Sequence, residues 1–178
     1  SGKYYNAPLK QNLFNPLTLK DNHDFCEKFF SYLMIQKSEL SDSNYKADEK
    51  KIAFIKNLLP KLATIKKLSD LKSEFINSGY YSFFKFWVAG SKLANIFDNE
   101  IDVFSDSKII GFDMSNVAKQ KPVLIPMLYY MLEKFESMLD SKPAILVINE
   151  AFKLLDNPFF APEIQNILFH GSGNQQIY

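Results

Sequence analysis

The sequence contains no arginine, so all 21 basic residues are lysines. Without a guanidinium group, the chain cannot supply an arginine finger, a bidentate clamp on a phosphate or an arginine contact to guanine. The formal net charge is only +1, far from the basic excess typical of proteins that bind nucleic acids. We therefore expect no sequence-specific nucleic acid as a partner.

Cysteine and histidine are almost as scarce. Cys26 is the only cysteine and cannot form an internal disulfide, and His23 and His170 are the only histidines. A zinc site of the usual kind needs about four such ligands at close spacing, so the sequence excludes one. Cys26 falls on an apolar helix face, where we expect it to be a small core residue.

Long apolar runs are also missing. The longest, residues 122–132 and 144–148, are well short of the roughly 20 residues that a membrane-spanning helix needs. No signal peptide is present. The chain begins with Ser1-Gly2 rather than Met, and we interpret it as an internal segment of a longer protein.

A phosphate-binding loop is absent as well. Such a loop is a glycine-rich turn whose N–H groups hold phosphate, followed by Lys and then Ser or Thr. The nearest candidates are Gly2-Lys3-Tyr4, Gly90-Ser91-Lys92 and Gly171-Ser172-Gly173, and none has the full pattern. The sequence therefore offers nothing to hold the β- and γ-phosphates of a nucleotide.

Apolar residues make up 47% of the chain and aromatic residues 15%, which is enough to bury a core. Residues 1–20 are expected to be strand and loop. Apolar residues spaced three and four positions apart predict a helix that starts at about Asp21, with Asp21 or Asn22 as its N-cap. The same spacing predicts a second helix from about Ala47, which Pro60 interrupts. A third begins at Ser69 and ends at Gly79, and we interpret 80–97 as one helix in which a break would fall near Gly90.

The last third alternates between strand and helix patterns. Lys108–Met114 and Ala144–Ile148 read as buried strands, and Pro122–Met138 reads as a helix between them. Further helices are expected through Lys153–Leu155 and over Pro162–Phe169. Apolar strands separated by helices predict a parallel α/β sheet, so the helical block at about 21–97 is expected to be an insertion or an appended bundle.

The second strand pattern ends in Asn149-Glu150. An apolar strand that closes in two acid-type side chains is the layout of a Walker B motif, in which the first residue serves magnesium and the second polarises water. Many buried strands end in an acidic residue only because the chain then meets solvent or caps a helix. Asp113, at the end of the first strand, has the same two interpretations: it faces a nucleotide, or it caps residues 115–117.

Three other features have a structural and a functional interpretation. The acidic residues of 98–102 form a solvated loop or a metal site. The aromatic run 80–87 belongs to the core of the helical block or to a groove for a partner, and its surplus aromatics suggest a contact with the α/β part of the protein or with another subunit. The lysine-rich stretch 50–67 is a solvated face, with lysine stems over apolar surface, or a contact to anionic lipid or DNA.

Four blocks occur in one order, and the resemblance they carry extends over nearly the whole chain: Phe14-Asn15-Pro16-Leu17, Ile96-Phe97-Asp98-Asn99-Glu100, Gly111-Phe112-Asp113-Met114, and 145–155 around Asn149-Glu150. Their order and spacing resemble the large cytoplasmic ATPase of VirB-type type IV secretion and conjugation systems. The resemblance weakens after about Gln165.

The resemblance implies an α/β fold: part of a RecA-like P-loop motor domain with an inserted all-helical subdomain. It divides the chain into 1–20 leading into the insertion, 21–97 as the helical subdomain, and 98–178 with the Walker B strand. It also implies ATP and Mg in the intact family, other subunits of the secretion channel and a homo-oligomer as partners, and a cytoplasmic location peripheral to the bacterial inner membrane, with contact to that membrane's surface.

One departure from the family pattern changes the chemistry. The family has Asp-Glu-Ala-Trp where this chain has Asn149-Glu150-Ala151-Phe152. The resemblance makes Glu150 the catalytic residue, Asn149 a weakened magnesium ligand, and Asn149 and Asp113 the cofactor-binding residues. We expect neither ATP nor Mg to bind this fragment tightly and the isolated chain to be inactive. The alternatives are a degenerate paralogue that serves as a scaffold, and a helical interaction domain unrelated to the family.

Overall fold

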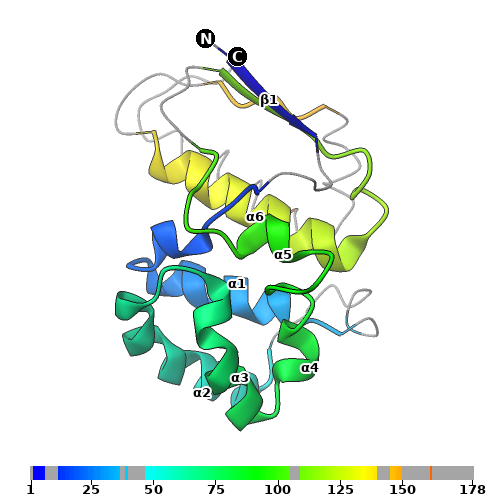
Figure 1. The fold of residues 1–178 in the computed structure, drawn as a ribbon. Coiled ribbons are helices and arrows are strands. Elements are labelled where there is room, and N and C mark those ends of the chain that lie inside the picture. The colour runs from blue at the N-terminus through cyan, green and yellow to red at the C-terminus, as the bar shows by residue number, and fades with distance from the viewer. Residues whose placement is uncertain are drawn as a thin grey trace.

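The computed structural model describes residues 2–6, 12–36, 39, 47–104, 109–139, 145–149 and 161. A two-stranded sheet lies at one end of the molecule and most of the helices lie at the other, with one long helix between them (Figure 1). In chain order the elements are β1 Gly2–Asn6, η1 Pro16–Leu19, α1 His23–Leu33, α2 Glu49–Leu58, η3 Leu59–Thr64, η4 Leu68–Leu71, α3 Lys72–Ser78, α4 Tyr81–Phe84, α5 Ala94–Phe97, β2 Ile109–Asp113 and α6 Lys121–Ser137.

The two strands are parallel, with Gly2 opposite Ile109 and Asn6 opposite Asp113. A parallel pair cannot be joined by a tight turn and needs a long crossover. Here the crossover contains the whole helical block. The predicted strand at 108–114 is confirmed as β2, although its residues are half-buried or exposed rather than fully buried.

Helices α1 and α2 begin at side-chain caps. The Asn22 carboxamide oxygen accepts a hydrogen bond from the Phe25 backbone N–H, at 3.0 Å, so Asn22 is the N-cap of α1. The Asp48 carboxylate does the same for the Lys51 N–H, at 2.8 Å, and starts α2. These bonds satisfy donors that have no partner within the helix.

Proline and glycine end elements in the helical block as the sequence predicts. α2 stops at Leu58, and Pro60 lies in the first turn of the 3-10 helix η3 that follows. α3 ends at Gly79, whose φ of +82° belongs to the left-handed region that glycine tolerates best.

The prediction of one continuous helix over 80–97 is wrong, but the break expected near Gly90 is confirmed. The segment contains two short helices, α4 and α5, separated by turns around Gly90, which has a φ of +92°. The Asp98 carboxylate stabilises this arrangement by accepting a hydrogen bond from the Ala89 backbone N–H, at 2.8 Å. A continuous helix would leave several of the aromatic side chains outside the core, whereas the broken segment buries both Phe84 and Trp87.

Helix α6 matches the prediction for 122–138 and continues through Pro126. Proline removes a backbone donor from a helix interior and is costly there. Nine residues of α6 are buried: the eight consecutive residues 123–130, which include Pro126, and Leu132. Tertiary packing therefore outweighs the local cost of the proline.

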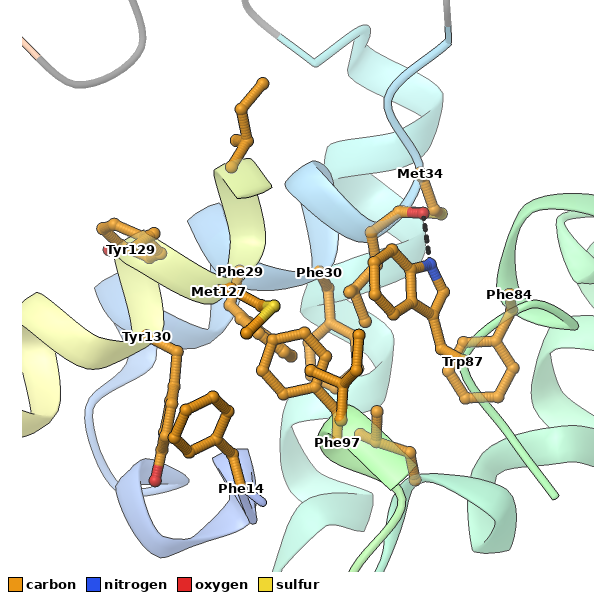
Figure 2. Close-up of a cluster of buried hydrophobic side chains, with 14 of the residues drawn as sticks. Phe14, Phe29, Phe30, Met34, Phe84, Trp87, Phe97, Met127, Tyr129 and Tyr130 are labelled. Carbon is orange, nitrogen blue, oxygen red and sulfur yellow. Dashed lines mark hydrogen bonds between the residues drawn. The ribbon is translucent and has the colours of Figure 1, made fainter. Parts of the chain in front are cut away.

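One continuous core links the helical block to α6 and the inner face of the sheet. Figure 2 shows its aromatic centre, where the Phe97 ring contacts the rings of Phe14, Phe29 and Trp87. Centroid separations of 5.0–6.0 Å with tilted or edge-on planes are favourable for aromatic pairs. The Trp87 indole N–H donates to the Leu33 carbonyl at 3.2 Å, so its one polar atom is satisfied.

The predicted buried strand at 144–148 is not found. Residues 145–148 form no strand, and Ile145 and Val147 are 88% and 82% exposed. A buried strand needs a hydrogen-bonded neighbour and cover on both faces, and the sheet in the described part of the chain consists of β1 and β2 alone. Ile148 is half-buried and packs against the core. The helices expected at 153–155 and 162–169 lie outside the described residues.

Candidate functional site

The parallel strands place Asn6 and Asp113 together at their carboxyl ends. In open α/β sheets, ligands bind at this edge. Asp113 Oδ1 accepts a hydrogen bond from the Ser115 backbone N–H at 2.9 Å and another from the Ser115 hydroxyl. These two bonds lower the pKa of the Asp113 carboxyl below its usual value. The side chain is therefore ionised at neutral pH and caps the turn that follows β2.

These bonds show the capping role of Asp113, which is compatible with ligand binding. The other predicted site residues contribute less to the described geometry. Asn149 is exposed in a turn, and no hydrogen bond joins it to Asp113 within the ranges that the structure describes. Glu150, the predicted catalytic residue, lies outside the described residues.

The described residues do not by themselves fit a magnesium nucleotide. Magnesium prefers near-octahedral oxygen ligands, but Asp113 and Asn149 are not brought together by any interaction. No group of three His, Cys, Asp or Glu side chains able to hold a metal occurs in the described ranges. No phosphate cradle is present in the sequence either, so we derive no catalytic step through the nucleotide or the metal.

Two of the sequence blocks that carry the resemblance meet in space. Leu13 and Phe14 donate backbone hydrogen bonds to the carbonyls of Asn95 and Ile96, at 2.9 and 2.8 Å. The buried Asn99 side chain returns a bond from its Nδ2 to the Phe14 carbonyl, at 3.0 Å. The segment before η1 is therefore fixed to the end of α5.

The loop at 98–102 is neither a simple solvated loop nor a metal site in this structure. Asp98 accepts hydrogen bonds from the backbone N–H groups of Ser69 at 2.7 Å and Ala89 at 2.8 Å. Asp102 accepts from those of Asn15 at 2.8 Å and Phe104 at 2.7 Å. Carboxylates that accept backbone N–H groups fix the chain much as helix caps do, so these two residues join four segments.

Tyr130 on α6 completes this network. Its side chain is fully buried, and its hydroxyl bonds to the Asp102 carboxylate and lies 3.3 Å from the Asn15 carbonyl. Burial is the main cause that raises the pKa of Tyr130 above its ordinary value, and the Asp102 charge raises it further. The phenol is therefore neutral and donates. We call Asn15, Asp102 and Tyr130 the junction network.

The sequence analysis missed the junction network. One sequence feature could have indicated such a network: Asn or Asp directly follows a large aromatic residue in Phe14-Asn15 and in Phe97-Asp98. A polar residue that follows a core aromatic often satisfies backbone groups at the edge of a core. The solvated interpretation considered the charges of 98–102 without these neighbours.

A groove of about 410 Å³ lies between the first turns of α1 and the second half of α6. Its lining includes Asp24, Glu27, Lys28 and Glu133, and the Lys28 ammonium lies 5.7 Å from the centre of the Tyr129 ring. Mixed charges of both signs line this groove, so it offers no strong field for a charged ligand.

The chain is similar to proteins of type IV secretion systems over part of its length. It is 30% identical over 83 residues to the type IV secretion system protein virB4 of Bartonella quintana and to that of Bartonella henselae. It is 31% identical over 83 residues to Protein virB4 of Agrobacterium fabrum. No protein-family model matches the chain.

The matched segment covers 46% of this chain but only 10–11% of each relative. The chain thus corresponds to about a tenth of the length of the curated relatives it matches. This similarity supports the resemblance to type IV secretion proteins and leaves the activity of the whole protein to be proposed. Separately, no helix among the described residues is both long and apolar enough to cross a membrane.

Proposed function

We propose that this chain is part of a type IV secretion or conjugation ATPase that energises channel assembly and macromolecule transport across the bacterial envelope. The observation that carries this proposal is the similarity over 83 residues to relatives named as virB4 proteins of type IV secretion systems. The order of the four sequence blocks agrees with it.

The topology supports a RecA-like motor with an inserted helical subdomain. β1 and β2 are parallel neighbours, and the helical block lies in the crossover between them. In this proposal the carboxyl ends of the strands, with Asp113, face the nucleotide. Glu150 is the catalytic carboxylate, and Asn149 is a weakened magnesium ligand. The intact protein works as a homo-oligomer with other subunits of the secretion channel, in the cytoplasm at the inner membrane.

The second candidate is a catalytically degenerate paralogue that acts as a scaffold in the same machine. Asn149 favours it, because an amide in the place of a carboxylate removes a negative charge that would bind magnesium. The missing phosphate-binding loop favours it too if the intact polypeptide also lacks one. Both candidates place the protein in a secretion machine and differ in whether it turns over ATP.

ATP turnover by the intact polypeptide, measured together with conjugative or secretory transport in cells, tests the proposal. For an active ATPase, Glu150→Gln should reduce turnover by about 10²-fold or more, since removal of a catalytic carboxylate acts on the transition state. Asn149→Asp should change turnover only modestly. Glu100→Gln, an exposed carboxylate away from the strand ends, is the matched control.

The two candidates predict different combinations of results. Loss of both turnover and transport in Glu150→Gln supports the motor. Absence of turnover in the unaltered protein, with transport intact in Glu150→Gln, supports the scaffold. Transport that does not require the protein at all contradicts both.

A further inference from the structure

The charges of the chain are unevenly distributed. Residues 50–92 contain nine lysines and two carboxylates, a formal charge of +7, whereas the remaining residues contain 12 lysines and 18 carboxylates, a charge of −6. The net charge of +1 therefore does not reveal that one segment of the chain is strongly basic. All residues of this segment are described in the structure, and they form α2 after its first residue Glu49, α3, α4 and the connections around them.

Among the described residues, few of these lysines pair with a carboxylate. Lys51 is buried against Glu39, with 3.1 Å between Nζ and Oε1, and Lys61 pairs with Glu74 at 2.5 Å. The other carboxylate in the segment, Asp70, accepts the backbone N–H groups of Lys66 and Lys67. The two acidic residues thus have partners already, and most of the lysine charge faces solvent.

Exposed apolar side chains occur within the same basic region. Ile76 on α3 is 51% exposed and Phe86, just after α4, is 53% exposed. The Lys72 ammonium lies 5.8 Å from the centre of the Tyr81 ring, and the Lys85 ammonium lies 5.2 Å from that of Phe86. We call these five residues the α3–α4 tip. In Figure 1, α3 and α4 lie at the end of the molecule opposite the sheet.

We infer that the α3–α4 tip binds the surface of an anionic lipid membrane. Lysines beside exposed aromatic and branched apolar side chains are the combination that binds the boundary between headgroups and acyl chains. The apolar groups enter the boundary, and the lysine ammoniums stay at the level of the anionic headgroups. The inference deepens the membrane location in the proposed function, on which it rests for the kind of membrane, by assigning the contact to one surface of the helical block. It holds whether or not the intact protein hydrolyses ATP.

The composition of the tip favours lipid over nucleic acid. DNA and RNA binding rely on phosphate contacts and, for single strands, on bases stacked on aromatic rings. Ile76 provides neither, and the aromatic faces of Tyr81 and Phe86 are each approached by a lysine ammonium. A lipid surface can contact both the exposed apolar side chains and the lysine ammonium groups of the tip.

Sedimentation of the 178-residue chain with lipid vesicles tests the inference. We expect binding to vesicles of phosphatidylethanolamine and phosphatidylglycerol, no binding to vesicles of phosphatidylcholine, and weaker binding as salt rises. Each lysine near such a surface contributes about fivefold to the binding constant. Lys72→Gln with Lys85→Gln should therefore weaken binding by about 25-fold.

Ile76→Ser with Phe86→Ser separates lipid insertion from simple charge attraction. This pair should weaken vesicle binding by about tenfold or more, since it removes the exposed apolar groups and leaves every charge in place. Ile101→Ser and Lys119→Gln, both exposed and outside the tip, are matched controls and should bind like the unaltered chain. Circular dichroism melting of each variant verifies that it folds.

Two results would overturn the inference. One is an absence of binding to anionic vesicles, or binding that the tip variants do not alter. The other is lysine-dependent binding of duplex or single-stranded DNA without binding of vesicles, which would assign the basic region to nucleic acid.

Discussion

In the helical block, aromatic rings are surrounded by other side chains, whereas only one face of the two-stranded sheet is packed against the rest of the protein. Phe97 is fully buried, and Ile109, on the outer face of β2, is 70% exposed. On the inner face, Phe112 stacks on Tyr5 at 5.4 Å and contacts Phe14. The helical block therefore has the contacts of a complete core, and the sheet has those of a layer attached to it.

This difference indicates that the residues that stabilise the fold and the residues with functional interpretations lie in different parts of the chain. The helical block and α6 supply the buried area that drives folding, and the strand ends supply the residues with functional interpretations. Under the proposed function, further parts of the motor domain cover the outer face of the sheet. The predictions below compare the two regions, beginning with the largest effect.

Phe97→Ala should cost about 3–5 kcal/mol of unfolding free energy, since it removes a fully buried ring and leaves a cavity between Phe14, Phe29 and Trp87. Urea unfolding followed by circular dichroism measures the loss. Phe86→Ala is the exposed control and should cost less than about 1 kcal/mol. Equal losses in the two variants would contradict the location of the core.

Asp102→Ala should cost about 2–3 kcal/mol, because the backbone N–H groups of Asn15 and Phe104 and the Tyr130 hydroxyl lose their acceptor. Tyr130→Phe should cost less, since both N–H groups keep the carboxylate. Urea unfolding of the two single variants and the double variant shows whether the losses are coupled. Additive losses would mean that the junction network does not act as a unit.

Stability should fall at alkaline pH. Burial raises the pKa of the Cys26 thiol from 9.0 to about 12, and the Asp21 charge adds to this. The folded state therefore holds its proton more tightly than the unfolded state. The contribution is complete below pH 9 and is lost as pH rises toward 12.

By pH 10 this loss amounts to about 1.4 kcal/mol. Unfolding free energies of the chain and of Cys26→Ala, measured between pH 8 and pH 10 at about one-unit steps, should show a flatter dependence for the variant. Parallel curves would show that Cys26 does not titrate differently in the two states. Alkylation of Cys26 should also be much slower in the folded chain than in urea, since its side chain is buried.

The smallest effect is expected on the outer face of the sheet. Ile109→Ala should change the unfolding free energy by less than about 0.5 kcal/mol, because most of the side chain already lies in solvent. Phe112→Ala, three residues along the same strand, is the half-buried counterpart that packs on the inner face and should cost about 2 kcal/mol or more. A larger loss for Ile109→Ala than for Phe112→Ala would reverse the assignment of the two faces.

Local signals predicted the parts of the fold that depend on neighbouring residues. Asn22 as a cap, Pro60 as an interruption and Gly79 as a helix end are fixed by backbone chemistry within one turn, and the structure confirms all three. The strand at 109–113 and the helix at 121–137 also follow from apolar patterns.

Features that depend on distant contacts could not be predicted in the same way. The apolar residues of 80–97 have helical spacing, but the aromatic side chains pack into the core only because the chain turns at Gly90. The Asp98 carboxylate stabilises this turn. The run 145–148 has the composition of a buried strand, yet its burial requires a neighbouring strand that composition alone does not supply. In the junction network, Asn15 bonds to residues 87 and 115 positions away, and Asp102 and Tyr130 are 28 positions apart, all beyond the reach of a local pattern.

As the central consequence of the proposed function, we propose that the ends of β2 and of 145–148 face a magnesium nucleotide in the intact protein. Replacement of magnesium by ferrous iron, followed by oxidative cleavage of the backbone beside the bound metal, tests it most directly. We predict ATP-dependent cuts next to Asp113 and next to Asn149-Glu150, strengthened by Asn149→Asp, which restores a carboxylate ligand, and unaltered by Glu100→Gln. Cuts elsewhere, or none that depends on ATP, would contradict the claim.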